Sequence, residues 1–159
     1  MIGNSPPTAR ALWSWVDLKQ KLLIIPAEAY KTDHIHVIPL VPEAVAILKS
    51  IHKGSEGEYI LSSTEGAKPI RGIGKFYRTR LPREIIACTG SEFSMPFTSH
   101  DLRRTVATRL GESLGVGGEQ LIKKVLGHSD GSVTAIYNRY GYVKEMRAGL
   151  EAWARELTK

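Results

Sequence analysis

Residues 98–110 read TSHDLRRTVATRL, and this stretch decides how the rest of the chain is interpreted. If it forms one α-helix, the spacing of three places the imidazole of His100 and the guanidinium of Arg103 on the same face. The opposite face is apolar and consists of Leu102, Val106 and Leu110. The stretch therefore predicts a helix with one hydrated, cationic side and one side that packs against a core.

The start of this helix has the residues of an N-terminal cap. Thr98 or Ser99 can cap the first turn, and Asp101 can supply the acidic partner of a capping box. The free amide groups and the helix dipole favour an anion at this end. A phosphate group is therefore a suitable ligand beside His100.

A second informative stretch, residues 121–140, reads LIKKVLGHSDGSVTAIYNRY. Its first half has an apolar stripe made of Leu121, Ile122, Val125 and Leu126. Gly127 is a typical stop at a helix C-terminus, and His128 follows it directly, away from the apolar face. This position favours a functional role for His128. A further helix places Tyr137 and Tyr140 on one face, where either can be a half-buried packing residue.

Together the two stretches resemble the catalytic domain of tyrosine recombinases, the phage integrase family. The resemblance lies in HDLRRTVATRL and LGHSDGSVTAIYNRY. These segments contain His-x-x-Arg, then Gly-His about one helix later, then a tyrosine nine residues beyond that histidine. The resemblance covers nearly the whole chain. It implies that His100 and Arg103 are the family's His-x-x-Arg pair. It also implies that His128 is the second histidine and Tyr137 the nucleophile, with Tyr140 as its rival.

The N-terminal third predicts a small antiparallel sheet. Short runs of β-branched and aromatic residues, WSWVDL, LLIIP and HIHVIPL, are separated by turn residues or a charged loop. The resemblance implies a three-stranded sheet at the DNA surface, in which the loop between the second and third strands carries a lysine that reaches the cleaved phosphate. Lys31 corresponds to that lysine. Outside the family context, a solvated loop lysine is the alternative.

Two histidines in the third run have a separate interpretation. On a strand, His34 and His36 point the same way and can present two imidazoles to a metal ion. No third ligand follows at a suitable spacing, so we expect no metal site and no cofactor. The alternative is that His36 is a packing residue beside the strand that ends at Leu40.

The middle of the chain predicts helices and a basic surface. A short amphipathic helix is expected over Pro42 to Lys53, followed by a loop around a short strand at 59–61. A second helix is expected over Phe76 to Arg80, interrupted near Pro82 and resuming through Ile86. The densest basic run consists of Lys75, Arg78, Arg80 and Arg83. It is either a solvated face or, together with Arg104, a surface that contacts DNA phosphates without sequence preference.

The last segment, Val143 to Lys159, has an apolar stripe at heptad-like spacing. The stripe consists of Val143, Met146, Leu150, Trp153 and Leu157. It packs either on its own domain or on a neighbouring protomer, as C-terminal segments do in recombinase assemblies. We therefore expect self-association on DNA, with Val143 to Leu157 as the candidate contact segment.

Composition agrees with an ordinary globular domain that binds a polyanion. The 159 residues have 42% hydrophobic content and a formal net charge of +6. The lone Cys88 suits a reducing compartment, and no run is apolar enough to span a bilayer. We expect one domain over residues 1–159, no membrane contact and a cytoplasmic location, encoded by a bacterium or phage.

One family feature is not found. The family carries an earlier arginine, in a Thr-Gly-x-Arg-x-x-Glu context, about nine residues before the tryptophan that heads the first strand. Here residues 3–8 read GNSPPT, and Asn4 or Ser5 stands at that place. We also expect the family's N-terminal DNA-clamping domain to be missing from this chain. The chain is thus expected to be either a degenerate relative or a fragment that begins too late.

These observations predict an α+β fold that is mostly α-helical, with a small antiparallel three-stranded sheet near the N-terminus followed by a helical bundle. The predicted function is site-specific recombination or integration of double-stranded DNA by strand cleavage and rejoining through a 3′-phosphotyrosyl intermediate. In that mechanism Lys31 protonates the leaving 5′ oxygen, which departs as a hydroxyl. The alternative is a catalytically impaired DNA-binding or assembly module derived from an integrase.

Overall fold

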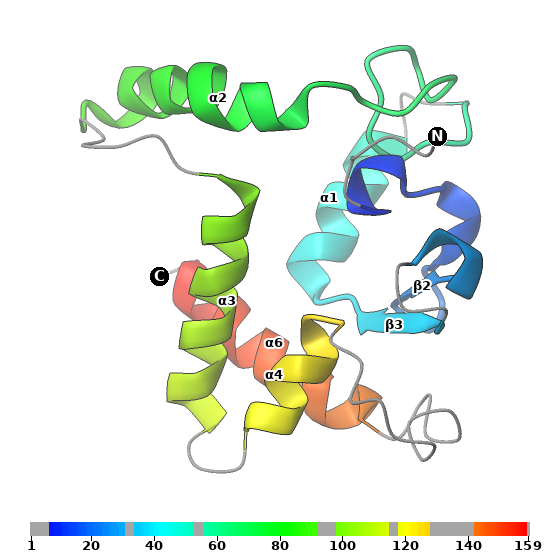
Figure 1. Ribbon diagram of the computed structural model, residues 1–159, viewed down its shortest axis with the longest axis vertical. Coiled ribbons are helices and arrows are strands. Elements are labelled where there is room, and N and C mark those ends of the chain that lie inside the picture. The colour runs from blue at the N-terminus through cyan, green and yellow to red at the C-terminus, as the bar shows by residue number, and fades with distance from the viewer. Residues whose placement is uncertain are drawn as a thin grey trace.

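A computed structural model describes residues 7–30, 34–52, 56–91, 98–114, 118–127 and 142–158 (Figure 1). Its strands are β1 (Val16–Asp17), β2 (Leu22–Ile25) and β3 (His36–Pro39). Its helices are α1 (Pro42–His52), α2 (Ile73–Thr89), α3 (Ser99–Leu114), α4 (Glu119–Val125) and α6 (Val143–Leu157). Short 3-10 helices lie at Pro7–Arg10, Trp13–Trp15 and Ala27–Ala29. The expected class, a mostly helical α+β fold with an N-terminal sheet, is confirmed.

The three strands form an antiparallel sheet in the order β1-β2-β3. Leu23 lies opposite Val16 on one side and Ile38 on the other, which confirms the predicted sheet. Two details differ from expectation. The WSW segment forms a 3-10 turn before β1, and the expected strand at 59–61 is a single bridge between Leu12 and Tyr59.

The core lies between the sheet, α3 and α6 (Figure 1). Leu22 and Val37 from the sheet, Leu110 from α3 and Met146 from α6 are all buried. Arg147 on α6 donates hydrogen bonds to the carbonyl oxygens of Gln20 (3.0 Å), Lys21 (3.3 Å) and Leu40 (3.3 Å). These bonds hold α6 to one end of the sheet, so the sheet and α3 are fixed on the same helix.

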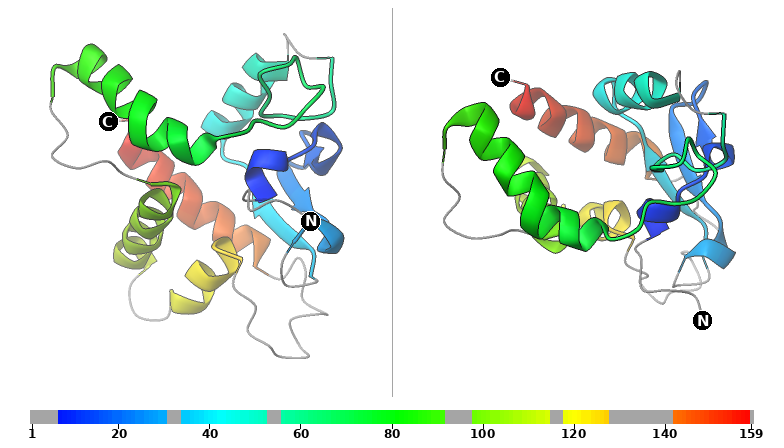
Figure 2. Two further views of the ribbon diagram at one scale, coloured as in Figure 1. Left: turned by 45° about the horizontal axis from the view of Figure 1, so that its top comes forward. Right: turned by 90° about the horizontal axis from the view of Figure 1, so that it is seen from above.

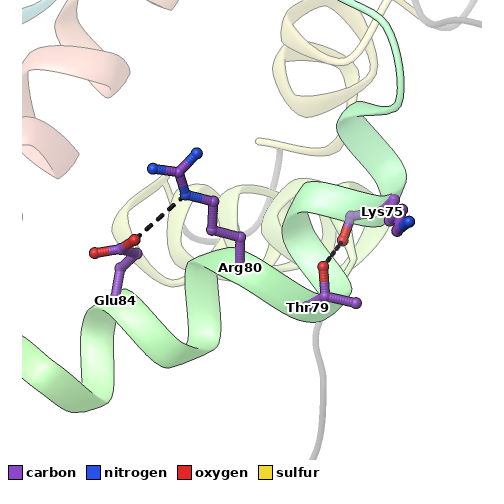
Figure 3. A network of polar contacts seen from close by, with 4 residues as sticks. All are labelled: Lys75, Thr79, Arg80 and Glu84. Carbon is purple, nitrogen blue, oxygen red and sulfur yellow. Dashed lines mark hydrogen bonds and ion pairs between the residues drawn. The ribbon is translucent and has the colours of Figure 1, made fainter.

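α2 is one continuous helix, and the interruption predicted near Pro82 is wrong. A proline inside a helix removes one backbone donor, here the one that would reach the carbonyl of Arg78. This loss is tolerated because α2 has no buried residue, so water can reach the released carbonyl. On the solvent side, Arg80 Nε lies 3.3 Å from Glu84 Oε1, and Thr79 Oγ1 donates to the carbonyl of Lys75 at 2.8 Å (Figure 3). Figure 2 shows α2 at the edge of the molecule, away from the sheet.

α3 begins with the predicted cap. The backbone N–H and the hydroxyl of Thr98 both donate to Asp101 Oδ2, at 2.9 and 2.7 Å. These bonds lower the pKa of the Asp101 carboxyl. The predicted apolar face is only partly buried: Leu110 is 1% exposed, whereas Leu102 is 45% exposed. The prediction for Leu102 is wrong because the core formed with α6 covers the later turns of α3, not the first one.

α6 packs on α3, α4 and β3 of its own domain. Met146 is buried, and most of the predicted stripe is half-buried. Leu157, in contrast, is 66% exposed. Packing within the domain therefore accounts for most of the stripe. Within the described ranges, every helix falls short of the length and apolar character that crossing a membrane requires.

Candidate active site

Arg103 lies on α3 and points to the end of α4. Its side chain is half-buried, and its Nη2 donates to the carbonyl oxygen of Leu126 at 2.5 Å. Leu126 is the residue that directly follows α4. The last carbonyls of a helix have no partner within the helix and carry partial negative charge. Arg103 therefore satisfies one of them with a charge-assisted hydrogen bond.

The end of α4 confirms the predicted stop at Gly127. The residue has a φ of 68°, in the left-handed region that favours glycine. Its N–H donates to the carbonyl of Lys124 at 3.0 Å, which closes the last turn. The turn directs the chain away from α4 at Gly127, and His128 is the next residue in the sequence.

Tyr30, which is 97 residues earlier in the chain than Gly127, contacts the same turn. It follows the 3-10 helix Ala27–Ala29, and its hydroxyl donates to the carbonyl oxygen of Gly127 at 3.2 Å. A Cβ atom placed on Gly127 would lie only 1.8 Å from that hydroxyl. Gly127 is thus required twice, for its backbone conformation and for the close approach of Tyr30.

His36, the first residue of β3, completes the contact. Its ring stacks on Tyr30 with centroids 5.0 Å apart and planes inclined by 27°. Burial and, after it, the nearby charge of Arg103 lower the pKa of His36 to about 4, although a hydrogen bond to the carbonyl of Val125 acts in the opposite direction. The imidazole is therefore neutral at pH 7.

Tyr30 is also neutral at pH 7. Burial raises the pKa of its phenol, and the charge of Arg103 offsets part of that rise. With both rings uncharged, Arg103 supplies the positive charge in this group of side chains. We call Tyr30, His36, Arg103 and the carbonyls of residues 125–127 the junction. It is where the β2–β3 connection, α3 and the end of α4 meet.

The junction contains one of the residues that the sequence predicted to be catalytic. Arg103 is part of it, and His100 is exposed in the first turn of α3. Lys31, His128, Tyr137 and the rival Tyr140 lie outside the described residues. Lys31 and His128 are, however, the direct chain neighbours of Tyr30 and Gly127, which are hydrogen-bonded to each other.

The predicted DNA-binding residues lie on two helices. Lys75, Arg78 and Arg80 are exposed on α2, and Arg104 is exposed on α3. Arg83, on the same helix as the first three, is exposed too. The Lys75–Arg83 run is therefore a solvent-facing cationic surface, and whether it contacts DNA stays a prediction.

The paired histidines do not form the unit that a metal site would need. His34 is exposed and precedes β3, whereas His36 is stacked on Tyr30 next to a cation. In the part of the chain that the structure describes, no three His, Cys, Asp or Glu side chains gather as metal ligands do. The packing interpretation of His36 agrees with its stack on Tyr30.

The sequence did not predict Tyr30 as a site residue, and it did not predict the contact of His36 with the carbonyl of Val125 on α4. The available signal was weak: Tyr30 directly precedes Lys31, and His36 opens the HVIP strand. Neither position shows that the partner is a helix end 97 residues away from Tyr30.

Comparison with known proteins places the chain in a class. The model of the phage integrase family matches residues 8–142, so the chain belongs to that family. The earlier resemblance is thereby confirmed.

A relative in this family is the prophage integrase IntZ of Escherichia coli (strain K12), which is 28% identical over 144 residues. The alignment covers 89% of this chain and 33% of the relative, so the chain spans about a third of the length of that protein. No solved structure matches the chain.

Proposed function

We propose that the chain carries the strand-transfer step of site-specific DNA recombination, with Tyr137 as the nucleophile. The phenol oxygen attacks a backbone phosphorus, the bond from phosphorus to the 5′ oxygen breaks, and a 3′-phosphotyrosyl link forms. The tyrosine proton passes to solvent, and Lys31 gives a proton to the leaving 5′ oxygen. Attack by a 5′ hydroxyl on the same phosphorus reverses these steps and rejoins a strand.

The observation that carries the proposal is the position of Arg103. A guanidinium has five N–H donors, and one of them is directed at Leu126. That bond fixes the group in space while the remaining donors can bind the nonbridging oxygens of a phosphate, where charge builds during the reaction. His100 and His128 are proposed to add hydrogen bonds to the same phosphate.

The junction supports the choice of Lys31 and His128. Each follows, by one residue, a described residue of the junction, and those two residues are bonded to each other. A lysine that enters a partly dried site together with another cation is a suitable general acid for the leaving oxygen.

For DNA binding we propose the cationic surface of α2 together with Arg104. All of these side chains are exposed, and those of α2 belong to a helix that lies at the edge of the molecule, so a duplex can reach them (Figure 2). Such contacts to phosphates supply affinity without sequence preference. We further propose that copies of the chain associate on DNA through α6, whose Leu157 is 66% exposed.

A second candidate is a module of the same family that binds DNA without cutting it. The observation that favours it is the segment GNSPPT at residues 3–8, which has no arginine where the resemblance expects the first phosphate-binding one. Loss of one such donor costs about 10²- to 10³-fold in rate by analogy with an oxyanion-hole donor.

One experiment separates the two candidates. The full chain is incubated with a pool of nicked duplexes that share constant ends and a randomised centre, and DNA attached covalently to protein is recovered and sequenced. An adduct that is lost in Tyr137→Phe and kept in Tyr140→Phe supports strand transfer. DNA retention without any adduct overturns strand transfer and supports the binding module.

A further inference from the structure

We propose that Tyr30 is a positioning residue, which ties the β2–β3 connection to the C-terminal turn of α4 through its hydroxyl. The inference rests on the proposed function, because its consequence is the placement of the general acid that follows Tyr30 in the chain. It assigns a part in the reaction to a side chain that touches neither substrate nor phosphorus.

The first argument is the way α4 ends. The carbonyls of its last residue and of the two residues after it, Val125, Leu126 and Gly127, each accept a hydrogen bond from a side chain of another segment. The donors are His36 of β3, Arg103 of α3 and Tyr30. A helix end normally meets water or a local cap at these positions. Here three distant segments are fixed on one turn.

The second argument is that Tyr30 is held at both ends of its side chain. Its backbone N–H donates to the carbonyl of Ala27 at 3.0 Å, which fixes the backbone at the end of a 3-10 turn. The ring stacks on His36, and the hydroxyl is bonded to Gly127. Movement of the Tyr30 backbone relative to α4 must therefore break or bend the hydrogen bond at the hydroxyl.

The third argument is that the hydrogen bond from the Tyr30 hydroxyl joins only the segment that contains Tyr30 to the end of α4. Arg103 and His36 also bind the end of α4, so α4 stays attached to α3 and β3 when the hydroxyl is removed. What is lost is the tether between α4 and the residue before Lys31. The defect should therefore appear in proton transfer to the leaving group and not in every step of the reaction.

The test compares two leaving atoms. Duplexes selected by covalent attachment to the wild-type chain are made with either oxygen or sulfur bridging the phosphorus and the 5′ carbon. A thiol has a pKa near 8.5, so a 5′ sulfur leaves as the thiolate without a proton. With the oxygen duplex, Tyr30→Phe should form adduct about 10- to 100-fold more slowly than wild type. With the sulfur duplex, its rate should lie within about threefold of wild type.

Three further variants calibrate the result. Lys31→Met should show the same preference for sulfur, at about 10²-fold or more. Tyr59→Phe removes a phenol hydroxyl elsewhere and should behave as wild type with both duplexes. Replacement of Tyr30 by 4-aminophenylalanine, which restores a donor at the same place, should restore the rate with oxygen.

The outcomes are distinguishable. If the wild-type chain forms no adduct with any duplex, the proposed function fails. If wild type forms adduct and Tyr30→Phe is slowed equally with oxygen and sulfur, or not at all, the positioning role is overturned. If Tyr30→Phe does not fold by circular dichroism, the comparison of 4-aminophenylalanine with 4-methoxyphenylalanine at this position decides the same question.

Discussion

Arg103 on α3 is bonded through its guanidinium to the carbonyl oxygen of Leu126, at the end of α4. The bond places a permanent cation at the negative end of a helix dipole and next to two uncharged rings. Since one donor suffices for Leu126, the guanidinium can hold the two helices together and bind a phosphate at once. Its planar fork, and not its charge alone, is what allows both.

The fork of Arg103 should matter more than its charge. Arg103→Lys keeps the charge but cannot reach Leu126 and a phosphate with fixed parallel donors, so we expect the rate of adduct formation to fall about 10²- to 10³-fold. The matched control is Arg104→Lys, at an exposed position one residue later, which should change that rate less than about threefold. Single-turnover assays with a selected nicked duplex measure both. Equal effects of the two variants would contradict a special role for Arg103.

Gly127→Ala should destabilise the fold by more than its backbone conformation alone explains. A residue with a Cβ is strained at a φ of 68°, and the Cβ would also meet the Tyr30 hydroxyl at 1.8 Å. The two effects together should lower the free energy of unfolding by about 2–4 kcal/mol. Urea denaturation followed by circular dichroism measures this change.

Gly90 provides the control for this measurement. It has nearly the same φ, 67°, after α2, yet a Cβ there would meet nothing within 4 Å. Gly90→Ala should therefore cost about 1 kcal/mol, the strain without the clash. The double variant Gly127→Ala with Tyr30→Ala should regain part of the difference. Equal costs for the two glycine substitutions would mean that Tyr30 does not approach Gly127 as the structure shows.

How far the sequence predicted the fold depends on how local each signal is. The cap at Thr98 and Asp101 and the stop at Gly127 were predictable, because both result from residues a few positions apart. The sheet was predictable from its β-branched runs. Pro82 led to a wrong prediction. The rule against proline in helices assumes that a carbonyl without its helical hydrogen bond costs free energy, and on an exposed helix water can bind that carbonyl instead.

The candidate site was predictable only in part, for the same reason. His100 and Arg103 are predicted site residues because of their spacing on one helix and because of the resemblance. The exposure of Leu102 depends on where α6 crosses α3, which no local pattern states. Likewise, the contact of Tyr30 and His36 with α4 depends on tertiary packing and not on any pattern within the β2–β3 segment.

The neutral imidazole of His36 should make stability depend on pH. Its pKa is about 4 in the folded chain and 6.5 in the unfolded one, so between these values the unfolded state binds more protons. The free energy of unfolding contributed by this group is thus complete above pH 6.5 and is lost as the pH falls toward 4. Because the ring is only half-buried, we expect a loss of about 1–3 kcal/mol.

The variant His36→Gln isolates this contribution. It removes the titrating group but leaves Tyr30 and Arg103, the groups that face it, in place. Urea denaturation of both proteins at several pH values between 4 and 7 gives, for each protein, the slope of the free energy of unfolding against pH. The wild-type slope should exceed that of the variant over this interval. Parallel curves would show that His36 is protonated as readily in the folded as in the unfolded chain.

The contribution of the cationic side chains of α2 to DNA binding should be measurable from the salt dependence of the affinity. Each phosphate that a cation neutralises adds about 0.9 to the slope of log affinity against log salt, so Lys75→Ala and Arg78→Ala should each reduce the slope by about 1. Arg80 differs, because it lies 3.3 Å from Glu84 (Figure 3). Glu84→Gln releases it and should raise affinity by up to about fivefold, the equivalent of an exposed ion pair. Lys49→Ala, an equal change of charge on the exposed side of α1, is the control and should leave the slope unchanged. If Lys49→Ala lowers the slope as much as the α2 variants do, net charge and not α2 determines binding.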